Sequence, residues 1–261
     1  MRNLIDTDHI AKELTFERTL SFGQSGPDVK MAQEWLNLHG IELVIDGKYG
    51  ANTRRAIIRF QHARGIKESG LVDADTFNRL TLPIRRAIAM QSLNNDSPNH
   101  IIVSYAEQHL RECPHEIGGQ NRGPWVRLFM KGNEGRQWSW CAGFVSFILM
   151  QTFATLSNEL ILDYTFSCDE LAHDAMEKNI FIEESQLREM TIKPGMIFLK
   201  RRKKSDWVHA GIVTSSDGNY INSIEGNTNE MGRYNGDRVM RKRRVLRNIN
   251  LINPELATAM S

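Results

Sequence analysis

The sequence has few cysteines and no spacing typical of a metal site. Its three cysteines, Cys113, Cys141 and Cys168, are too few and too scattered for a disulfide framework. No two of them have the close spacing of a metal-binding pair, and the eight histidines include no His-Glu-x-x-His zinc motif. We therefore expect no structural disulfide, no metal and no other cofactor.

Long apolar runs and an excess of one charge are absent as well. The formal net charge is only +2, so overall charge dictates no partner, and nucleic acid is not expected. No apolar run reaches the ~18 residues of a membrane-spanning helix, so we expect no stable membrane insertion. Residues 1–8 lack the apolar core of a secretory signal peptide. The composition, 41% hydrophobic and 25% charged, is typical of a globular protein.

The first third of the chain is compact and rich in turns. Residues 1–17 are expected to form a short helical arm, and residues 18–82 a separate small domain. Pro27 suits the first turn of a helix, where its missing N–H costs nothing, and Gly40 suits the end of that helix. Residues 46–50, Asp-Gly-Lys-Tyr-Gly, predict a tight loop, because glycine adopts positive φ without strain.

Two further helices are expected after this loop. Asn52 or Thr53 can cap the second helix, and Asp73 or Asp75 can start a short third one. The pattern is carried by Gly23, Gly26, Asp28, Val29, Gln33, Leu36, Gly40, Asp46, Gly47, Gly50, Thr53, Ala56, Phe60, Gln61, Gly70 and Thr76. It resembles the three-helix peptidoglycan-binding module of bacterial and phage wall hydrolases. The resemblance implies targeting rather than chemistry, with a sugar–peptide groove beside residues 46–53.

The rest of the chain begins with a linker and then changes from helices to strands. We expect residues 83–98 to be the linker, in which residues 83–90 can continue as helix and residues 93–98 are polar and turn-rich. The expected helices cover 101–110, 124–130, 141–156 and 168–179, and the expected strands cover 196–200, 207–213, 219–225 and 239–245. The short Asp217-Gly218 link predicts an antiparallel hairpin. Helices followed by strands predict an α+β domain with an antiparallel sheet over residues 99–261.

One cysteine begins a long apolar segment. The segment from Cys141 to about Leu156 is too long for a buried strand and predicts a buried helix. Cys141 would lie in the first turn, where unpaired amides and a positive partial charge stabilise a thiolate. Cys141 is therefore a candidate nucleophile, and a small buried core residue is the alternative.

Two expected strands carry polar residues that can serve such a nucleophile. Alternation places His209 on one face of its strand, and Glu225 and Asn227 on one face of the next. A helix packed on that face would bring Cys141 to His209. A thiol, a base and a group that orients the base are the parts of thiol catalysis. A structural histidine and a solvated glutamate are the alternatives.

These motifs occur together in the order of a known family. They are Trp140-Cys141-Ala142-x-Phe144-Val145, His209-Ala210-Gly211-Ile212-Val213 and Ile224-Glu225-Gly226-Asn227, preceded by Asn121-Arg122-Gly123-Pro124. Over about residues 99–246 the chain resembles the CHAP family of cysteine, histidine-dependent amidohydrolases and peptidases, relatives of the NlpC/P60 hydrolases with a papain-like fold.

The resemblance implies catalytic roles for these residues. It makes Cys141 the nucleophile and His209 the general base and then acid. Glu225 is the favoured orienter of His209, and Asn227 is the alternative. The acidic calcium loop of some relatives has no counterpart here, so again no metal is expected.

Other residues near the motifs are candidates for binding. Asn121, Arg122, Trp140 and Trp207, together with Trp138, are candidates for substrate contact, and ordinary packing is the alternative for the tryptophans. Cys113 and Cys168 are expected to be core or idle thiols. The basic runs 201–204 and 241–244 are expected to be solvated faces, with contact to anionic envelope polymers as the alternative.

The sequence therefore predicts a monomeric peptidoglycan hydrolase that cuts the muramoyl–L-alanine amide or a stem-peptide bond. A non-catalytic wall-binding protein and a thiol acyltransferase are the alternatives. Because no signal peptide is seen, we expect synthesis in the cytoplasm and action on the wall. Delivery would be through a holin, as for a phage lysin, or through a dedicated secretion system, as for an antibacterial effector with an immunity protein.

Overall fold

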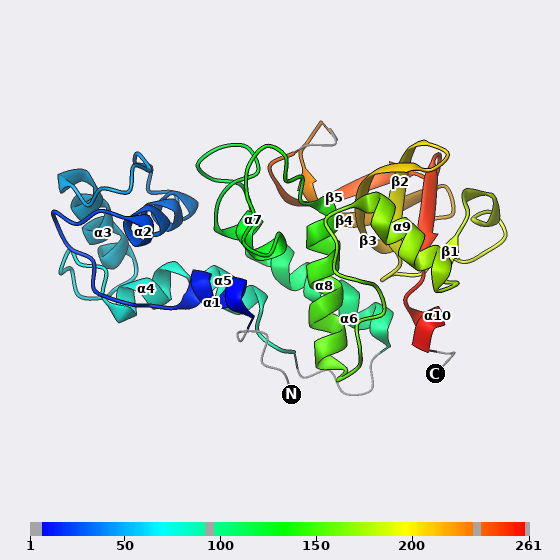
Figure 1. The fold of residues 1–261 in the computed structure, drawn as a ribbon, viewed down its shortest axis with the longest axis horizontal. Helices are drawn as coiled ribbons and strands as arrows, with labels where there is room; N and C mark the ends of the chain where they lie inside the picture. Colours follow the sequence, from blue (N-terminus) through cyan, green and yellow to red (C-terminus); the bar gives the residue numbers. More distant parts are fainter. Residues whose placement is uncertain (1–6, 92–96, 232–235, 259–261) are drawn as a thin grey trace.

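The computed structural model describes residues 7–91, 97–231 and 236–258. Its helices and strands are, in chain order, α1 Asp8–Leu14, α2 Pro27–Leu38, α3 Ala51–Ala63, α4 Ala74–Leu80, α5 Leu82–Ala87, α6 Pro98–Arg111, α7 Pro124–Phe129, α8 Cys141–Thr155, α9 Cys168–Glu177, β1 Phe181–Ile182, a 3-10 turn at Glu184–Gln186, β2 Ile197–Lys203, β3 Asp206–Ser216, β4 Tyr220–Thr228, β5 Arg238–Val245, β6 Ile249–Ile252 and α10 Glu255–Thr258. The molecule is elongated, with α2, α3 and α4 at one end and the sheet at the other (Figure 1).

The N-terminal helices form the predicted three-helix unit. Pro27 is the first residue of α2, and Asp73 caps α4 by accepting a hydrogen bond of 2.9 Å from the N–H of Thr76. The N-cap of α3 differs from the prediction: it is Gly50 rather than Asn52 or Thr53. The hydroxyl of Thr53 is used instead to hold the preceding loop, because it donates to the carbonyl of Lys48.

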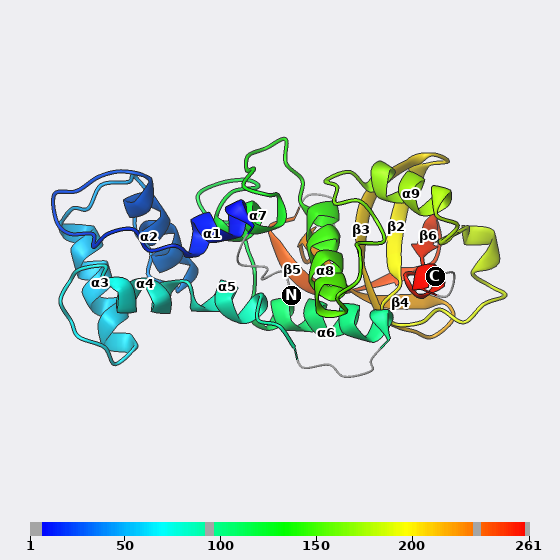
Figure 2. The same ribbon diagram turned by 60° about the horizontal axis from the view of Figure 1, so that its bottom comes forward.

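The expected linker at residues 83–98 contains packed structure. Residues Leu82–Ala87 form α5, and the side chains of Ile84 and Ala87 are fully buried. The amide of Gln108 in α6 donates to the carbonyls of Arg86 and Ala87 at 2.7 and 2.9 Å. Figure 2 shows α5 ending beside α6. The polar part of the predicted linker falls mostly on residues 92–96, which lie outside the described residues.

The C-terminal half contains one antiparallel sheet of the described strands, in the order β1-β6-β2-β3-β4-β5. All four predicted strands are present, and the hairpin of β3 and β4 is confirmed. The strands β1 and β6 were not predicted; they pair with each other, and β6 also pairs with β2. The mixed fold of helices and an antiparallel sheet after an N-terminal helical region agrees with the prediction.

Helix α8 lies against the sheet and is buried on nearly every side, as its uniformly apolar sequence predicts. Two glycines permit this close packing. A Cβ on Gly143 would lie 2.6 Å from the carbonyl oxygen of Phe129 in α7, and a Cβ on Gly226 would lie 2.7 Å from Cβ of Phe144. Helix α8 therefore has little freedom to move, and the position of its first residue, Cys141, is fixed.

The helical unit is packed directly onto the rest of the chain. Trp35 of α2 meets Trp125 of α7 with ring centroids 6.3 Å apart, and both side chains are buried. One hydrophobic cluster runs from α1 and α2 through α7 and α8. Within the described residues, no helix is long and apolar enough to cross a membrane.

Candidate active site

Cys141 occupies the first position of α8, directly after the N-cap residue Trp140. Its side chain is only 4% exposed. At this position the free amides and the positive end of the helix favour a thiolate. The sequence predicted this position at the start of a helix, and the position favours the thiolate form of the Cys141 side chain.

His209 of β3 and Glu225 of β4 lie next to each other in the sheet, and His209 is also close to Cys141. Nε2 of His209 is 2.8 Å from Oε2 of Glu225, and both side chains are fully buried. Gly211 makes room for this contact, because a Cβ there would lie 2.8 Å from Cγ of Glu225. The other ring nitrogen of His209, Nδ1, has no nitrogen or oxygen partner within the described residues. It is the nitrogen that can serve the Cys141 thiol.

The charges of this group are coupled. Burial alone would favour a neutral ring, but Cys141 and Glu225 raise the pKa of His209 to about 9. The pKa of Cys141 is well below its usual value, because a hydrogen bond from Cys168 and, despite burial, the interaction with His209 both favour the thiolate. A thiolate–imidazolium pair is therefore the favoured state near neutral pH.

Asn227, the alternative orienter, lies elsewhere. Regular alternation would place it on the face of Glu225, but the pairing of β4 with β5 shifts register between Glu225 and Thr228. Asn227 has a φ of 53° in this irregular stretch. With its amide oriented to satisfy both neighbours, it accepts from the N–H of Trp140 at 3.2 Å and donates to the carbonyl of Gly236 at 2.6 Å. Asn227 thus supports the start of α8 and makes no contact with His209.

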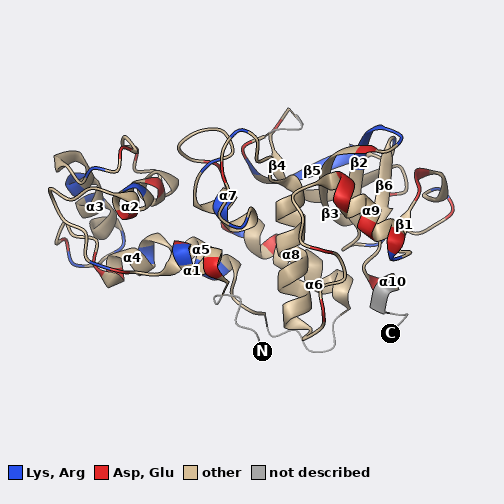
Figure 3. Cartoon of the chain, viewed as in Figure 1, with Lys and Arg blue, Asp and Glu red and all other residues tan. Residues whose placement is uncertain are grey.

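Arg244 of β5 completes the polar group, and the sequence analysis missed it. Its Nε and Nη2 donate to the two carboxylate oxygens of Glu225 at 2.6 and 2.5 Å. The hydroxyl of Ser223 donates to Oε1 of the same carboxylate at 2.7 Å. Although burial opposes ionisation, Arg244 and His209 lower the pKa of Glu225 to about 2. The basic run 241–244, visible as a blue stretch of β5 in Figure 3, therefore includes a partly buried partner of Glu225.

Cys168, which was expected to be a core or idle thiol, is buried and lies close to Cys141. It is the first residue of α9, and its Sγ lies 3.8 Å from Sγ of Cys141. The neighbouring thiolate and burial raise the pKa of Cys168, so it remains a thiol and can donate to Cys141.

Three of the predicted substrate-binding side chains are buried and serve the fold. Trp140 stacks on Phe129 and donates from Nε1 to Glu116 at 2.9 Å. Trp207 donates from Nε1 to Asn250 at 3.0 Å. Asn121 donates from its amide to the carbonyl of Arg136 at 3.1 Å.

Arg122 is the exposed member of that set, and it pairs with Glu134 at 3.3 Å. The prediction failed for the three buried side chains because nearness to a motif in sequence does not report which way a side chain points.

A groove does lie beside Cys141. A cavity of about 340 Å³ is lined by Met130, Gln137, Trp138, Ser139, Tyr164, Thr165, Phe166, Ser167 and Glu170. Most of these residues come from the loops that precede Cys141 and Cys168, and Glu170 lies in α9. Trp138, a predicted cleft residue, packs edge-on against Phe166 in its wall. The groove combines aromatic and polar side chains, and Ser139 in its lining is close to Cys141 in sequence.

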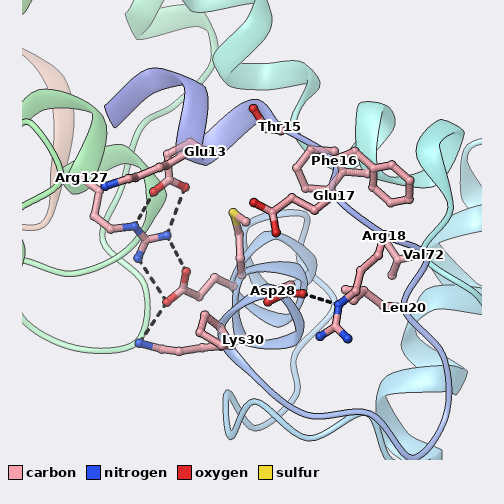
Figure 4. Close-up of a pocket in the computed structure, with 15 residues that line it drawn as sticks. Glu13, Thr15, Phe16, Glu17, Arg18, Leu20, Asp28, Lys30, Val72 and Arg127 are labelled. Atoms are coloured by element: carbon pink, nitrogen blue, oxygen red, sulfur yellow. Dashed lines mark hydrogen bonds and ion pairs between the residues drawn. The ribbon is translucent and has the colours of Figure 1, made fainter. Parts of the chain in front are cut away.

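Two other cavities belong to the N-terminal part. One of about 320 Å³ lies beside Asp46, Lys48 and Thr53, where a groove was expected. Gln33 shapes it by donating to Oδ1 of Asp46 at 2.9 Å and accepting from Gly47 N–H at 2.8 Å. The other, about 520 Å³, lies between the arm and α2 and is closed on one side by Arg127 (Figure 4). None of its lining residues lies in α8 or in the sheet.

The described ranges bring together no three His, Cys, Asp or Glu side chains that could hold a metal ion.

Residues 25–80 match the family model described as "Putative peptidoglycan binding domain". The chain is also similar to the zinc D-Ala-D-Ala carboxypeptidase of Streptomyces albus G, with 32% identity over 108 residues, which are 40% of this chain and 38% of that relative. The chain thus spans well under half of the relative's length. The match at residues 25–80 confirms the resemblance of the N-terminal helical unit to peptidoglycan-binding domains.

Proposed function

We propose that the protein is a peptidoglycan hydrolase that uses Cys141 to cut an amide bond of the cell wall. The observation that carries the proposal is the convergence of Cys141, His209 and Glu225 in a chain that also contains a peptidoglycan-binding domain. The bond is the muramoyl–L-alanine amide or a bond within the stem peptide. For residues 99–261 we propose a catalytic domain of the CHAP family with a papain-like fold.

The first chemical step is attack of the Cys141 thiolate on the amide carbonyl carbon. The thiolate needs no further activation, since His209 already holds a proton in the resting pair. The backbone amide of Cys141 in the first turn of α8 stabilises the oxyanion that forms. The N–H of Trp140 is unsuited to this task because Asn227 accepts it.

The remaining steps return the enzyme to its starting state. The His209 imidazolium gives its proton to the leaving amine, the C–N bond breaks, and a thioester joins the substrate acyl group to Cys141. Neutral His209 then takes a proton from water, which attacks the thioester. The thiolate leaves, the carboxylic acid is released, and the thiolate–imidazolium pair forms again.

The groove beside Trp138 and Ser139 suits an extended peptide with polar groups, and the N-terminal domain would raise the local concentration of wall substrate. Delivery to the wall would use a holin or a dedicated secretion system. The carboxypeptidase of Streptomyces albus G is named as a zinc enzyme. The described residues of this chain contain no group of three side chains that could hold a metal ion, so we derive no step through a metal.

The test is mass spectrometry of muropeptides after digestion of purified sacculi. The wild type should release fragments that have gained one water at an amide, and Cys141→Ala should release none. Cys113→Ser is the matched control, because Cys113 is exposed and outside the site.

Each of the other outcomes would indicate a different activity of this protein. Digestion by a folded Cys141→Ala variant would refute the mechanism, and new cross-linked products would indicate an acyltransferase. Loss of only the terminal D-alanine would indicate carboxypeptidase activity, and binding without products a non-catalytic wall protein.

A further inference from the structure

We propose that Arg244 is a positioning residue that sets the charge state of the Cys141–His209 pair through Glu225. The proposal rests on the proposed function for its catalytic meaning. It also extends that function, because Arg244 belongs to a basic run that the sequence assigned to the surface.

The first argument is the geometry of the contact. Arg244 pairs with Ile221 across the β4–β5 ladder, and Glu225 pairs with Met240, so both polar side chains lie on one face of the sheet. The guanidinium donates to both oxygens of the Glu225 carboxylate in a bidentate arrangement. Arg244 is 16% exposed and Glu225 is fully buried. The ring of Phe198 covers the guanidinium at 5.8 Å.

The second argument is the balance of buried charge. A thiolate, an imidazolium and a carboxylate together carry one net negative charge in a site almost without solvent. Such an uncompensated charge is costly, and the cheapest relief is to protonate the thiolate. Arg244 makes the group of four neutral in total, which keeps Cys141 as a thiolate while Glu225 stays ionised.

The third argument concerns the proton on His209. A carboxylate whose pKa is about 2 is too weak a base to take the proton from an imidazolium whose pKa is about 9. The proton therefore stays on His209, where the leaving amine needs it. Without Arg244, the carboxylate would become more basic and would share the proton along the 2.8 Å contact with Nε2.

Arg241 and Arg243 of the run lie on the opposite face of β5, whereas Lys242 shares the face of Arg244 and donates from Nζ to the carbonyls of Asn229 and Glu230 at 2.9 and 3.0 Å. Arg243 pairs with Asp217 at 2.8 Å, lies over the ring of Tyr220 and is 58% exposed. Arg241 pairs with Glu107 at 2.6 Å and is equally exposed. Arg243 is thus a matched control: the same residue type on the same strand, with its side chain on the opposite face.

The other titratable groups near the four are few. They are Cys168 of α9 beside Cys141, Asp169 beside Cys168, and Lys200 of β2 near Arg244. Each is unchanged in the variants below, so a difference between variants reports the guanidinium.

The experiment measures the pH dependence of Cys141 alkylation by iodoacetamide, followed on the peptide that contains Cys141. Arg244→Met should raise the midpoint by about one pH unit, the lower end of the range for a nearby charge, because Arg244 acts on Cys141 through Glu225 and His209. Arg244→Lys keeps a charge but loses the bidentate arrangement, and its midpoint should lie between those of wild type and Arg244→Met. Arg243→Met and Arg243→Lys should match the wild type.

Coincident curves for the Arg244 and Arg243 variants would overturn the proposal. If Arg244→Met fails to fold, the comparison of Arg244→Lys with Arg243→Lys decides the question alone. Alkylation needs no substrate, so the result stands apart from the proposed function: a wild type that cuts no muropeptide refutes the function, whereas unshifted alkylation refutes the role of Arg244.

Discussion

Replacing Arg127 should separate the N-terminal domain from the rest of the protein. Arg127 of α7 contacts Glu13 of α1 at 2.5 Å, Glu34 of α2 at 2.8 Å and Glu134 at 2.9 Å. Figure 4 shows its guanidinium directly beside Glu13, at one side of the pocket. The side chains of Glu13 and Glu34 are 6% and 3% exposed, so Arg127→Met would leave two buried carboxylates without their main partner.

The cost follows from that burial. Removing one partner of a buried ion pair typically costs about 3–5 kcal/mol. Lys30 remains near Glu34 at 3.6 Å, but it is 43% exposed and contributes little. We therefore expect a loss of about 3 kcal/mol, which corresponds to about 6–12 °C in Tm for a chain of this size.

Calorimetry and hydrogen exchange would test this expectation. Arg127→Met should melt earlier and should lose amide protection in α2 and α7. The control Arg122→Met removes an exposed partner of the same Glu134 and should cost at most about 1 kcal/mol. Adding Glu13→Gln and Glu34→Gln to Arg127→Met should recover roughly half of the loss, since no buried charge then stays unpaired. A loss below about 1 kcal/mol in Arg127→Met, with unchanged exchange, would refute the reasoning.

Four further predictions follow from the site. The alkaline limb of kcat/KM should lie near pH 9, where the His209 imidazolium loses its proton, and Glu225→Gln should move it to lower pH because the stabilising carboxylate is gone; an unmoved limb would contradict the assignment. Asn227→Ala should cost about 1–3 kcal/mol in urea unfolding yet leave that limb in place. Gly211→Ala should lower both stability, by about 1–3 kcal/mol, and turnover, since its Cβ would press on Glu225. Val44→Asp, at an exposed groove residue, should weaken sacculus binding in a pull-down while hydrolysis of soluble muropeptides stays unchanged.

The N-terminal domain could be predicted closely because its structure depends on local chemistry. Pro27 can only start a helix, and Asp73 sits where a cap is required. The error at α3 has a physical cause of the same kind. Thr53 is a good capping residue, but its hydroxyl bonds to the loop carbonyl of Lys48, and the cap falls to Gly50. A contact with the loop just before the helix decided between two uses of the Thr53 side chain.

The candidate site could be predicted only in part. Cys141 and His209 stand at positions that local patterns mark, a helix start and an alternating strand. The choice between Glu225 and Asn227 depended on an irregularity in β4 that alternation does not reveal. Arg244 could be found only by combining alternation along its strand with the pairing of β4 and β5, because a run of basic residues otherwise indicates a solvated face.

The most consequential difference between the prediction from the sequence and the structure concerns how the two parts of the chain are joined. A flexible linker would make the binding domain a tether, and its effect would be on local concentration alone. Here Trp35 packs on Trp125, Arg127 joins two carboxylates of the N-terminal part, and α5 is buried. Helix α7 carries both Trp125 and Arg127 and also packs against α8, where Gly143 meets the carbonyl of Phe129. The same short helix therefore supports the docked domain on one side and the first turn of the Cys141 helix on the other. Loosening the docked domain should consequently disturb the nucleophile itself.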